Sequence, residues 1–468
     1  MRCQRSLFVF VLLVGTAAIA KSQPPHPTVG GNMVVSLTVD ATAPPLPALK
    51  YRLLPELLEL QTGNQIQAFY KCFFEQQYLF HNKESTDKQQ KWLEAPLKDL
   101  VNEKELVGYG GAALKQAHYA ARLDSVDWQI LNQARAQGAF LLLPDVQSMR
   151  MLANVLRIRA RGEIARGEFD NAIQTLQTMF ALGRTFNDHP TLIGHLVGIA
   201  ITTVTLGVVE EFVQQPGAPN LFWALTDLPS PLLDLRKGVQ GEKLILSKEF
   251  EVLRRRTPIE ESELKVLLRK FDPLVSIAGD GKGDMKPSQW YAKQSGDKAV
   301  VAAAREQLLK LDYKAADLDK YSPLQIVLMG DFTQYEVNLD DFTKWTNLPL
   351  WQIPADFAKA DRTATPFGQL LPAWANVLQA KVRLQQHVAL LITGEAIRAQ
   401  AADGGKLPAS LEGVKLPLPV DPVTGKAFSF EVKDGKGTLH GTVPIVGRSL
   451  RTPLNRVYEM SLRKKLSE

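Results

Sequence analysis

Two carboxylates in the last third of the chain have the spacing that acid–base chemistry needs. Glu336 and Asp340 are four residues apart, so on a helix they share one face. Paired carboxyl groups about 5–9 Å apart across a cleft hydrolyse glycosidic bonds. With Trp345 close by, the pair points to a hydrolase or lyase that acts on an extracellular polymer. The alternative is an ordinary solvated face, because acidic side chains normally lie in water.

The histidines and cysteines do not show metal-ligand spacing. The sequence has no His-Glu-x-x-His and no Cys-x-x-Cys. His189 and His195 are six residues apart, whereas neighbours on one helix face are three or four apart. The glycine-rich stretch 279–284 lacks the Ser or Thr that follows Lys in a P-loop. Cys72 lies among aromatic residues, which predicts a buried, inert thiol. We therefore expect no metal and no cofactor.

The first twenty residues have the features of a secretory signal peptide. Arg2 and Arg5 precede the uncharged run 7–20, which ends in the small-x-small sequence Ala18-Ile19-Ala20. This predicts export to the periplasm or the extracellular space after cleavage near Ala20. An uncleaved anchor is the alternative, although the run is short for a ~20-residue membrane span. Loss of Arg2 and Arg5 lowers the net charge from +6 to +4, an excess too small to favour nucleic acid.

Proline, glycine and a change of periodicity divide the chain into regions. Met33 to Val39 shows partial alternation typical of a short strand. The helical pattern resumes after it, and the period switches back to two near the C-terminus. The predicted regions are a signal peptide (1–20), a Pro-rich extended segment with a short strand (21–50), an N-terminal helical region (51–271), a flexible loop (272–298), a second helical region (299–403), a β-hairpin unit (404–447) and a basic tail (448–468).

Two consecutive helices in the first helical region resemble one tetratricopeptide repeat. Apolar residues at helical spacing end near Gly167, and a second helix begins at Phe169. A tight glycine turn between the two lets them pack closely antiparallel. Leu156 and Glu163 depart from the pattern, which has a Trp and an aromatic residue there, and no second copy follows at a 34-residue period. The resemblance rests on Ala160, Gly167, Phe169, Ala172 and Leu176.

The stretch from Thr191 to Val209 contains no Lys, Arg, Asp or Glu. It includes Gly194 and Gly198, a spacing that lets two helices approach closely. A transmembrane helix is one interpretation. We favour a buried central helix and expect no stable membrane span in the mature chain, because His195 and several Thr interrupt the apolar run and Asp188 starts it as a soluble helix.

The C-terminal region resembles the globular end of type II secretion pseudopilins. A long helix over 369–402 ends at a Gly pair, and apolar residues then alternate with polar ones before Asp434-Gly435 turns the chain. The likeness covers residues 384–443. The pilin processing site and assembly stem are absent, so assembly into a pilus is not implied. Asp421 and Asp434 fit turn roles better than calcium ligation.

Taken together, these features are similar to a group of exported proteins of planctomycete-type bacteria. The resemblance is carried by four segments, and it implies export and a helical body without implying a reaction. The segments are 48–55, 161–180, 190–200 and 407–430.

The sequence therefore predicts a mainly α fold, an irregular antiparallel helical array of α-solenoid type with a small C-terminal β-hairpin unit. Helical repeats present concave binding surfaces, and no catalytic signature other than Glu336 and Asp340 is found. The favoured function is a non-catalytic binding or scaffold protein of the periplasm or cell envelope, whose partner is a protein or an envelope component. The alternative is the carboxylate-dependent hydrolase or lyase. The oligomeric state is left open.

Overall fold

The computed structural model describes residues 28–29, 32–138, 141–247, 249–275, 285–354, 365–371, 374–443 and 455–464. The expected signal peptide over 1–20 lies outside the described residues and stays a prediction. Within the described part the protein is mainly helical with a small sheet, which confirms the predicted fold class.

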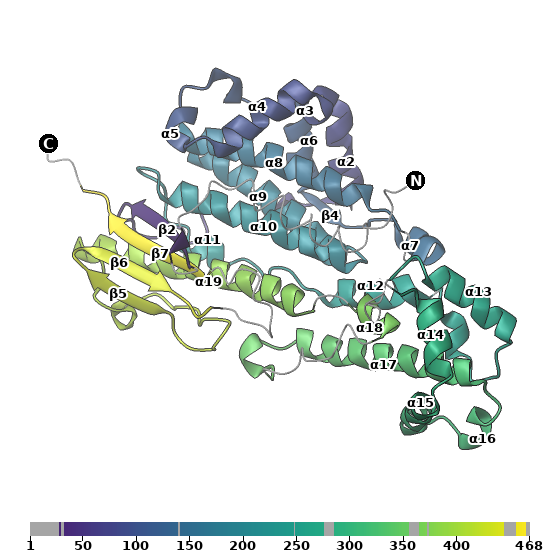
Figure 1. The fold of residues 1–468 in the computed structure, drawn as a ribbon. Coiled ribbons are helices and arrows are strands. Elements are labelled where there is room, and N and C mark those ends of the chain that lie inside the picture. The colour runs from purple at the N-terminus through teal and green to yellow at the C-terminus, as the bar shows by residue number, and fades with distance from the viewer. Residues whose placement is uncertain are drawn as a thin grey trace.

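The helices form layers, and the buried helix α10 (Leu192–Val213) lies among them (Figure 1). The outer layer is α2 (Gln65–Glu75), α3 (Gln77–His81), α4 (Lys83–Glu94), α5 (Leu97–Leu100) and α6 (Gly111–Ala120), and α7 (Leu131–Gln137) lies apart from these, beside α12 (Arg236–Ser247) (Figure 1). Beneath the outer layer lie α8 (Pro144–Ala165), α9 (Phe169–Thr185), α10, α11 (Phe222–Thr226) and α12.

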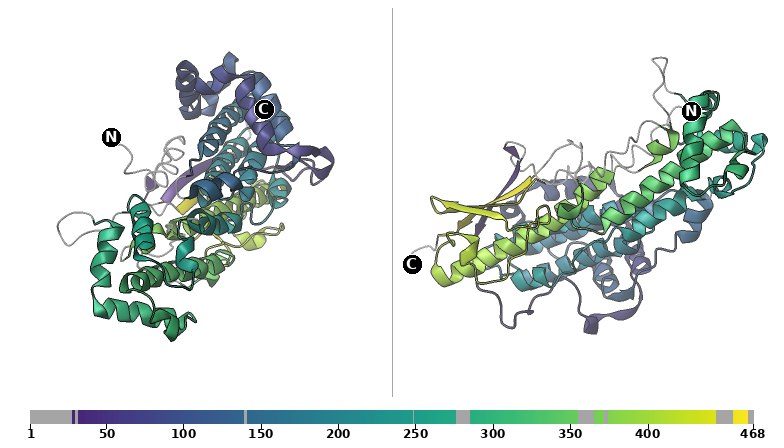
Figure 2. Two further views of the ribbon diagram at one scale, coloured as in Figure 1. Left: turned by 90° about the vertical axis from the view of Figure 1, so that its right-hand side faces the viewer. Right: turned by 90° about the horizontal axis from the view of Figure 1, so that it is seen from below.

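The second half of the chain adds α13 (Glu261–Phe271), α14 (Pro287–Ser295), α15 (Lys298–Lys310), α16 (Ala315–Leu318), α17 (Pro323–Thr346), α18 (Pro366–Leu370) and α19 (Trp374–Gly404). Seen from below, α17 and α19 run along the long axis of the molecule, with the sheet at one end and α13–α16 at the other (Figure 2). The 3-10 turns are η1 (Leu57–Glu59), η2 (Lys104–Leu106), η4 (Phe186–Asp188), η5 (Glu251–Arg254), η6 (Leu350–Gln352) and η7 (Leu411–Gly413).

The predicted helical hairpin corresponds to α8 and α9. Gly167 lies between them at φ 73°, a left-handed conformation that costs glycine little. Glu163, at a position where the repeat pattern has an aromatic residue, is buried within this hairpin. Whether the hairpin acts as a tetratricopeptide unit stays a prediction.

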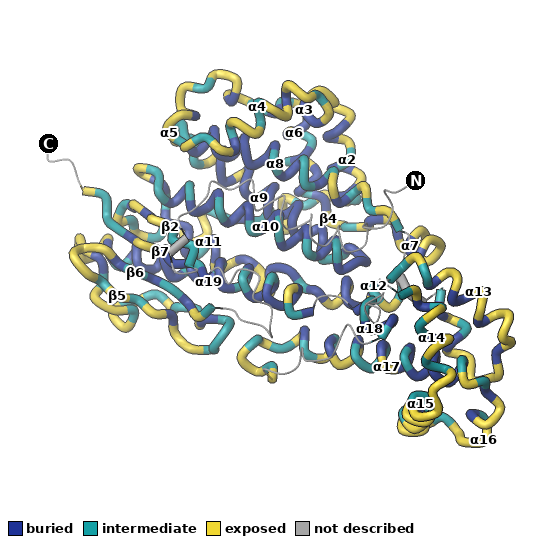
Figure 3. Tube along the Cα trace, in the orientation of Figure 1, coloured by how far each residue is buried: buried dark blue, intermediate teal, exposed yellow. Residues whose placement is uncertain are grey.

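The apolar stretch from Thr191 forms α10, which begins with the Thr191 hydroxyl accepting from the Gly194 amide at 3.1 Å. Among the described helices it is the one long and apolar enough to cross a membrane, and 72% of its most apolar window is buried. Helices α8, α9, α12 and α19 pack around it, and the burial map shows it inside the molecule (Figure 3).

Two glycines let α10 approach its neighbours. A Cβ on Gly194 would lie 2.1 Å from His189 Nδ1, and one on Gly198 would lie 2.6 Å from Phe186 Cβ and 3.0 Å from the Gly183 carbonyl oxygen. The Gly-x-x-x-Gly spacing noted in the sequence is therefore a helix-packing feature.

The sheet brings together the two ends of the chain. Its strand order is β1 (Thr28–Val29), β2 (Asn32–Val39), β7 (Asn455–Leu462), β6 (Lys436–His440) and β5 (Ser429–Lys433). Strands β2 and β7 are parallel, and the β7–β6 and β6–β5 pairs are antiparallel. Strands β3 (Gln61–Asn64) and β4 (Leu123–Ser125) form a separate pair.

The expected strand and hairpin are both present. Asp434 (φ 49°) and Gly435 (φ 74°) form the turn between β5 and β6, as two-residue hairpins require. Two regions differ from expectation. Residues 455–462 of the expected basic tail form β7, because Tyr458 and Met460 alternate into the core. Residues 287–295 of the expected flexible loop form α14, with Pro287 at its first turn and Tyr291 buried.

We predict that Gly198→Ala lowers the free energy of unfolding by about 1–3 kcal/mol, because the new methyl group overpacks the α9–α10 contact. Gly404→Ala is the control, since nothing lies within 4 Å of a Cβ at that position. Urea unfolding of the two variants measures the difference. Equal stability of both variants would contradict the packing role.

Candidate functional site

The predicted catalytic pair, Glu336 and Asp340, lies on the surface of α17. Arg254 donates to Glu336 at 2.9 Å, and Lys243 is ion-paired with Asp340. The Glu336 and Asp340 side chains are 36% and 65% exposed. Both carboxylates therefore face solvent next to a cation, and their catalytic role stays a prediction. The nearby aromatic residues Phe332, Tyr335 and Phe342 are buried in the core.

Three histidines, of which the sequence analysis named His189 and His195, are spread over two places. His118 Nδ1 is 2.7 Å from Thr178 Oγ1. His189 and His195 are both buried, and each places Nδ1 3.0 Å from an oxygen of Thr191. Among the residues that the structure describes, no group of three or more His, Cys, Asp or Glu is placed to hold a metal ion.

Burial makes two of these histidines resist protonation. It lowers the pKa of His118 to about 4, with help from the positive charges of Arg122 and Arg159. It lowers the pKa of His189 to about 3, and the neighbouring His195 adds to the effect. Burial also raises the pKa of the Cys72 thiol to about 12, which leaves a weak nucleophile at neutral pH.

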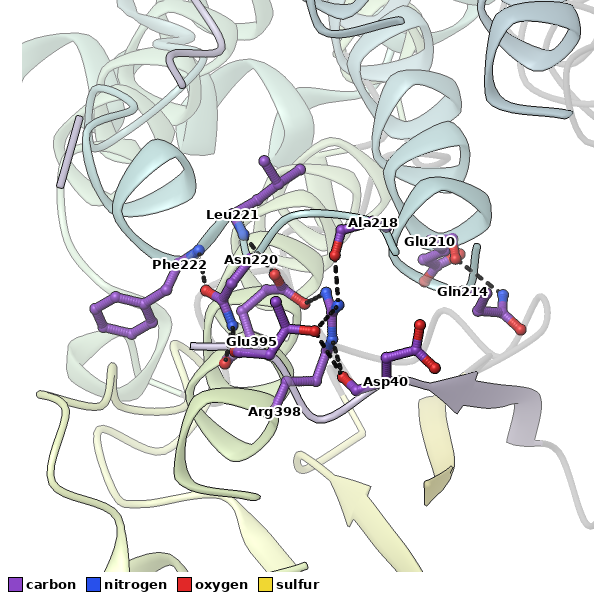
Figure 4. Close-up of polar contacts among 10 residues, drawn as sticks. Asp40, Glu210, Gln214, Ala218, Asn220, Leu221, Phe222, Glu395 and Arg398 are labelled. Atoms are coloured by element: carbon purple, nitrogen blue, oxygen red, sulfur yellow. Dashed lines mark hydrogen bonds and ion pairs between the residues drawn. The ribbon is translucent and has the colours of Figure 1, made fainter. Parts of the chain in front are cut away.

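A buried ion pair on α19, which was not predicted from the sequence, lies at the centre of a polar cluster (Figure 4). Arg398 Nη1 donates to Glu395 Oε1 at 2.7 Å, and the two side chains are 1% and 2% exposed. The name polar seam is used below for Glu395, Arg398 and the main-chain groups that they bind.

The polar seam joins three segments that are far apart in the sequence. Arg398 Nε donates to the Asp40 carbonyl at 3.1 Å, just after β2, and Nη2 donates to the Ala218 carbonyl at 3.1 Å. Glu395 Oε2 accepts from the Leu221 amide. Asn220 completes the junction, because its Nδ2 donates to the carbonyls of Glu395 and Thr42 at 2.9 and 3.0 Å.

A second buried cluster surrounds Glu210, near the end of α10. Glu210 Oε1 accepts from His387 Nε2 at 2.9 Å on α19 and from the Tyr458 hydroxyl at 2.6 Å on β7, and Arg456 makes an ion pair with the same oxygen. Burial alone raises the pKa of Glu210, but Arg456, His387 and Tyr458 together lower it to about 2. The carboxylate thus stays charged in the core.

A third cluster fixes α8 against the outer layer. Arg161 Nε donates to Glu211 at 2.8 Å, and its Nη1 donates to the Leu93 carbonyl at 3.1 Å, just before α4 ends. Glu163 accepts from the Thr175 hydroxyl at 2.7 Å, which ties α8 to α9. In all three clusters the charged groups already bind protein partners, so they order the chain instead of offering a free acid or base.

A pattern in the sequence does mark the polar seam. The apolar 4-3 rhythm of α19, through Leu384, Val388 and Leu391, continues at Glu395 and Arg398. Two oppositely charged residues that lie three positions apart on the apolar face of a helix indicate a buried ion pair. Glu210 is harder to find, because it stands beside Glu211 and looks like one half of a solvated acidic pair.

Comparison with protein-family models, with curated proteins and with solved structures gave no match. The resemblances to pseudopilins, to tetratricopeptide repeats and to exported planctomycete-type proteins therefore rest on the sequence features alone.

We predict that Arg398→Met lowers the free energy of unfolding by about 3–5 kcal/mol, because it leaves the Glu395 carboxylate buried without its charged partner. Arg236→Met, at the exposed pair with Asp234, is the control and is expected to change stability little. Adding Glu395→Gln to Arg398→Met recovers part of the loss, and a double-mutant cycle by urea unfolding measures the coupling. Purely additive losses would refute a coupled pair.

Acid should destabilise the protein from about pH 6.5 downward. The unfolded state binds protons at its histidines near that pH, whereas folded His118 and His189 bind them only near pH 4 and pH 3, so stability is lost as the pH falls. The pKa of Glu210 is lowered as well, and its contribution to stability, present above its unfolded pKa, is lost as the pH falls toward about 2. His118→Gln makes the decline shallower between pH 6.5 and 4, while His81→Gln, at an exposed site, leaves it unchanged. Thermal unfolding measured between pH 6.5 and 4 gives the slope of stability against pH for each variant.

Proposed function

We propose that the chain is an exported, non-catalytic helical protein that binds another protein or a component of the cell envelope. The single observation that carries the proposal is an exposed apolar surface on the outer layer. Leu57 and Leu58 in η1 are 83% and 94% exposed, and Tyr119 on α6 is 45% exposed. We call these three residues the η1 surface.

The turn that carries the η1 surface is linked to the helical body by an ion pair. Glu59, next to the two leucines, makes an ion pair with Arg122 at 3.3 Å, one turn after Tyr119. Arg122 in turn donates to Gln177 on α9 at 2.9 Å. These contacts position the turn that carries Leu57 and Leu58 before binding, which lowers the entropy that association costs, and neighbouring exposed apolar side chains are typical of contact sites.

The charge distribution also favours binding over catalysis. Glu336 and Asp340 each carry a cationic neighbour, and the buried Glu210 and Glu395 are occupied in holding helices and strands together. Nothing in this arrangement favours the alternative hydrolase or lyase. A periplasmic or extracellular location follows from the predicted signal peptide, and cell fractionation with an antibody against the mature chain tests it.

A photo-cross-linking residue at position 58 tests the proposed binding surface. In the native host it should give a discrete adduct with one partner, because Leu58 would lie inside the interface. The same residue at position 309 on α15, where Leu309 is 40% exposed, should give none. With the photo-cross-linking residue placed at position 119 in place of Tyr119, the double substitution Leu57→Asp and Leu58→Asp should abolish the adduct. The same double substitution should leave the unfolding curve unchanged.

Two results would refute the proposal. One is the absence of an adduct at position 58 in cells that export the protein. The other is a polymer-degrading activity of the purified chain that Glu336→Gln abolishes, which would establish the hydrolase instead.

A further inference from the structure

The last strand of the chain occupies a slot between two strands that come from elsewhere. Strand β7 pairs with β2 in parallel from Asn32↔Asn455 to Val39↔Leu462, and with β6 in antiparallel from Lys436↔Ser461 to His440↔Val457. Both edges of β7 are therefore hydrogen-bonded along the slot, as when a peptide adds to a sheet.

Side chains of β7 reach the body at three points. Arg456 and Tyr458 bind the buried Glu210 carboxylate. Met460 lies over α19, since a Cβ at Gly394 would be 3.8 Å from its Cε atom. Just beyond the strand, Arg463 Nε donates to Asp40 Oδ1 at 2.9 Å and its amide donates to the Val39 carbonyl at 2.8 Å.

The walls of the slot are attached to the body without β7. Strand β2 leads into the polar seam, where Arg398 holds the Asp40 carbonyl. The end of β6 is fixed by Thr442, whose amide donates to Asp421 at 2.7 Å and whose carbonyl accepts from Gln386 at 2.9 Å.

Glu210, at the floor of the slot, also has a hydrogen-bond partner outside β7. Glu210 remains bonded to His387 on α19 when Arg456 and Tyr458 are withdrawn. An empty slot would therefore not leave the carboxylate without any hydrogen-bond donor, which is the costliest state for a buried charge.

We infer that the slot between β2 and β6 is a binding site for an extended peptide, and that β7 is its resident ligand and can be exchanged. The slot recognises Arg, Tyr and Met at alternate positions, because successive inward side chains of a strand are two residues apart. Glu210 binds the Arg and Tyr side chains, and the Met side chain packs on α19. The C-terminal strand of a second copy carries the same pattern and is the partner that fits.

The test uses the full chain with a site-specific protease sequence in place of residues 446–452. After cleavage, a fluorescent peptide with the sequence of residues 455–464 is added, and its anisotropy is followed together with circular dichroism. We expect the cut protein to stay folded and to take up one labelled peptide per chain, which unlabelled peptide displaces.

Matched peptides test the recognition. A peptide with Tyr458→Phe loses one hydrogen bond to a charged group and should compete about 10- to 100-fold less well. A peptide with Ser461→Ala alters only the outward face, where Ser461 meets Thr38 at 3.3 Å, and should compete almost as well as the native sequence.

Three results would overturn the inference: unfolding of the chain on cleavage, failure of excess peptide to enter the cut protein, or equal competition by the Tyr458→Phe peptide. None of them bears on the η1 surface, so this inference and the proposed function succeed or fail separately.

Discussion

The structure depends most on the buried pair of Glu395 and Arg398. A charged pair taken out of water is tolerated only when its remaining donors and acceptors are satisfied. Here they are satisfied by main-chain groups of the segment after β2 and of the α10–α11 connection. The pair thus fixes the positions of two segments that are distant in the sequence. It does so through main-chain groups, which do not depend on the side chains at those positions.

The Glu210 cluster imposes the same requirement at the sheet. Its carboxylate lies near the end of α10, the most apolar of the described helices, and accepts hydrogen bonds from α19 and from β7. Strand β2 pairs with strand β7 beside the Glu210 cluster. Together the two clusters explain why the sheet sits on α10 and α19, although its strands come from opposite ends of the chain.

The local patterns were sufficient for most of the helices and for the hairpin. Gly167 marked the turn between α8 and α9, and Asp434-Gly435 marked the turn between β5 and β6, because both turns need left-handed backbone. The local pattern misleads at residues 448–468, because the basic side chains obscure the alternation of Tyr458 and Met460. It does not predict the burial of Glu210 either, since a carboxylate next to another carboxylate looks solvated when its donors lie about 180 to 250 residues away.

Periodicity and backbone conformation within a few residues are enough to predict the helical class, the buried character of α10 and the positions of the tight turns. The pairing of β2 with β7, the contacts of Glu395 and Arg398 with distant segments, and the cations next to Glu336 and Asp340 are seen only in the folded chain. The physical reason is that hydrogen bonds and ion pairs between distant residues leave no period in the sequence. Their partners become neighbours only when the chain buries its apolar surface.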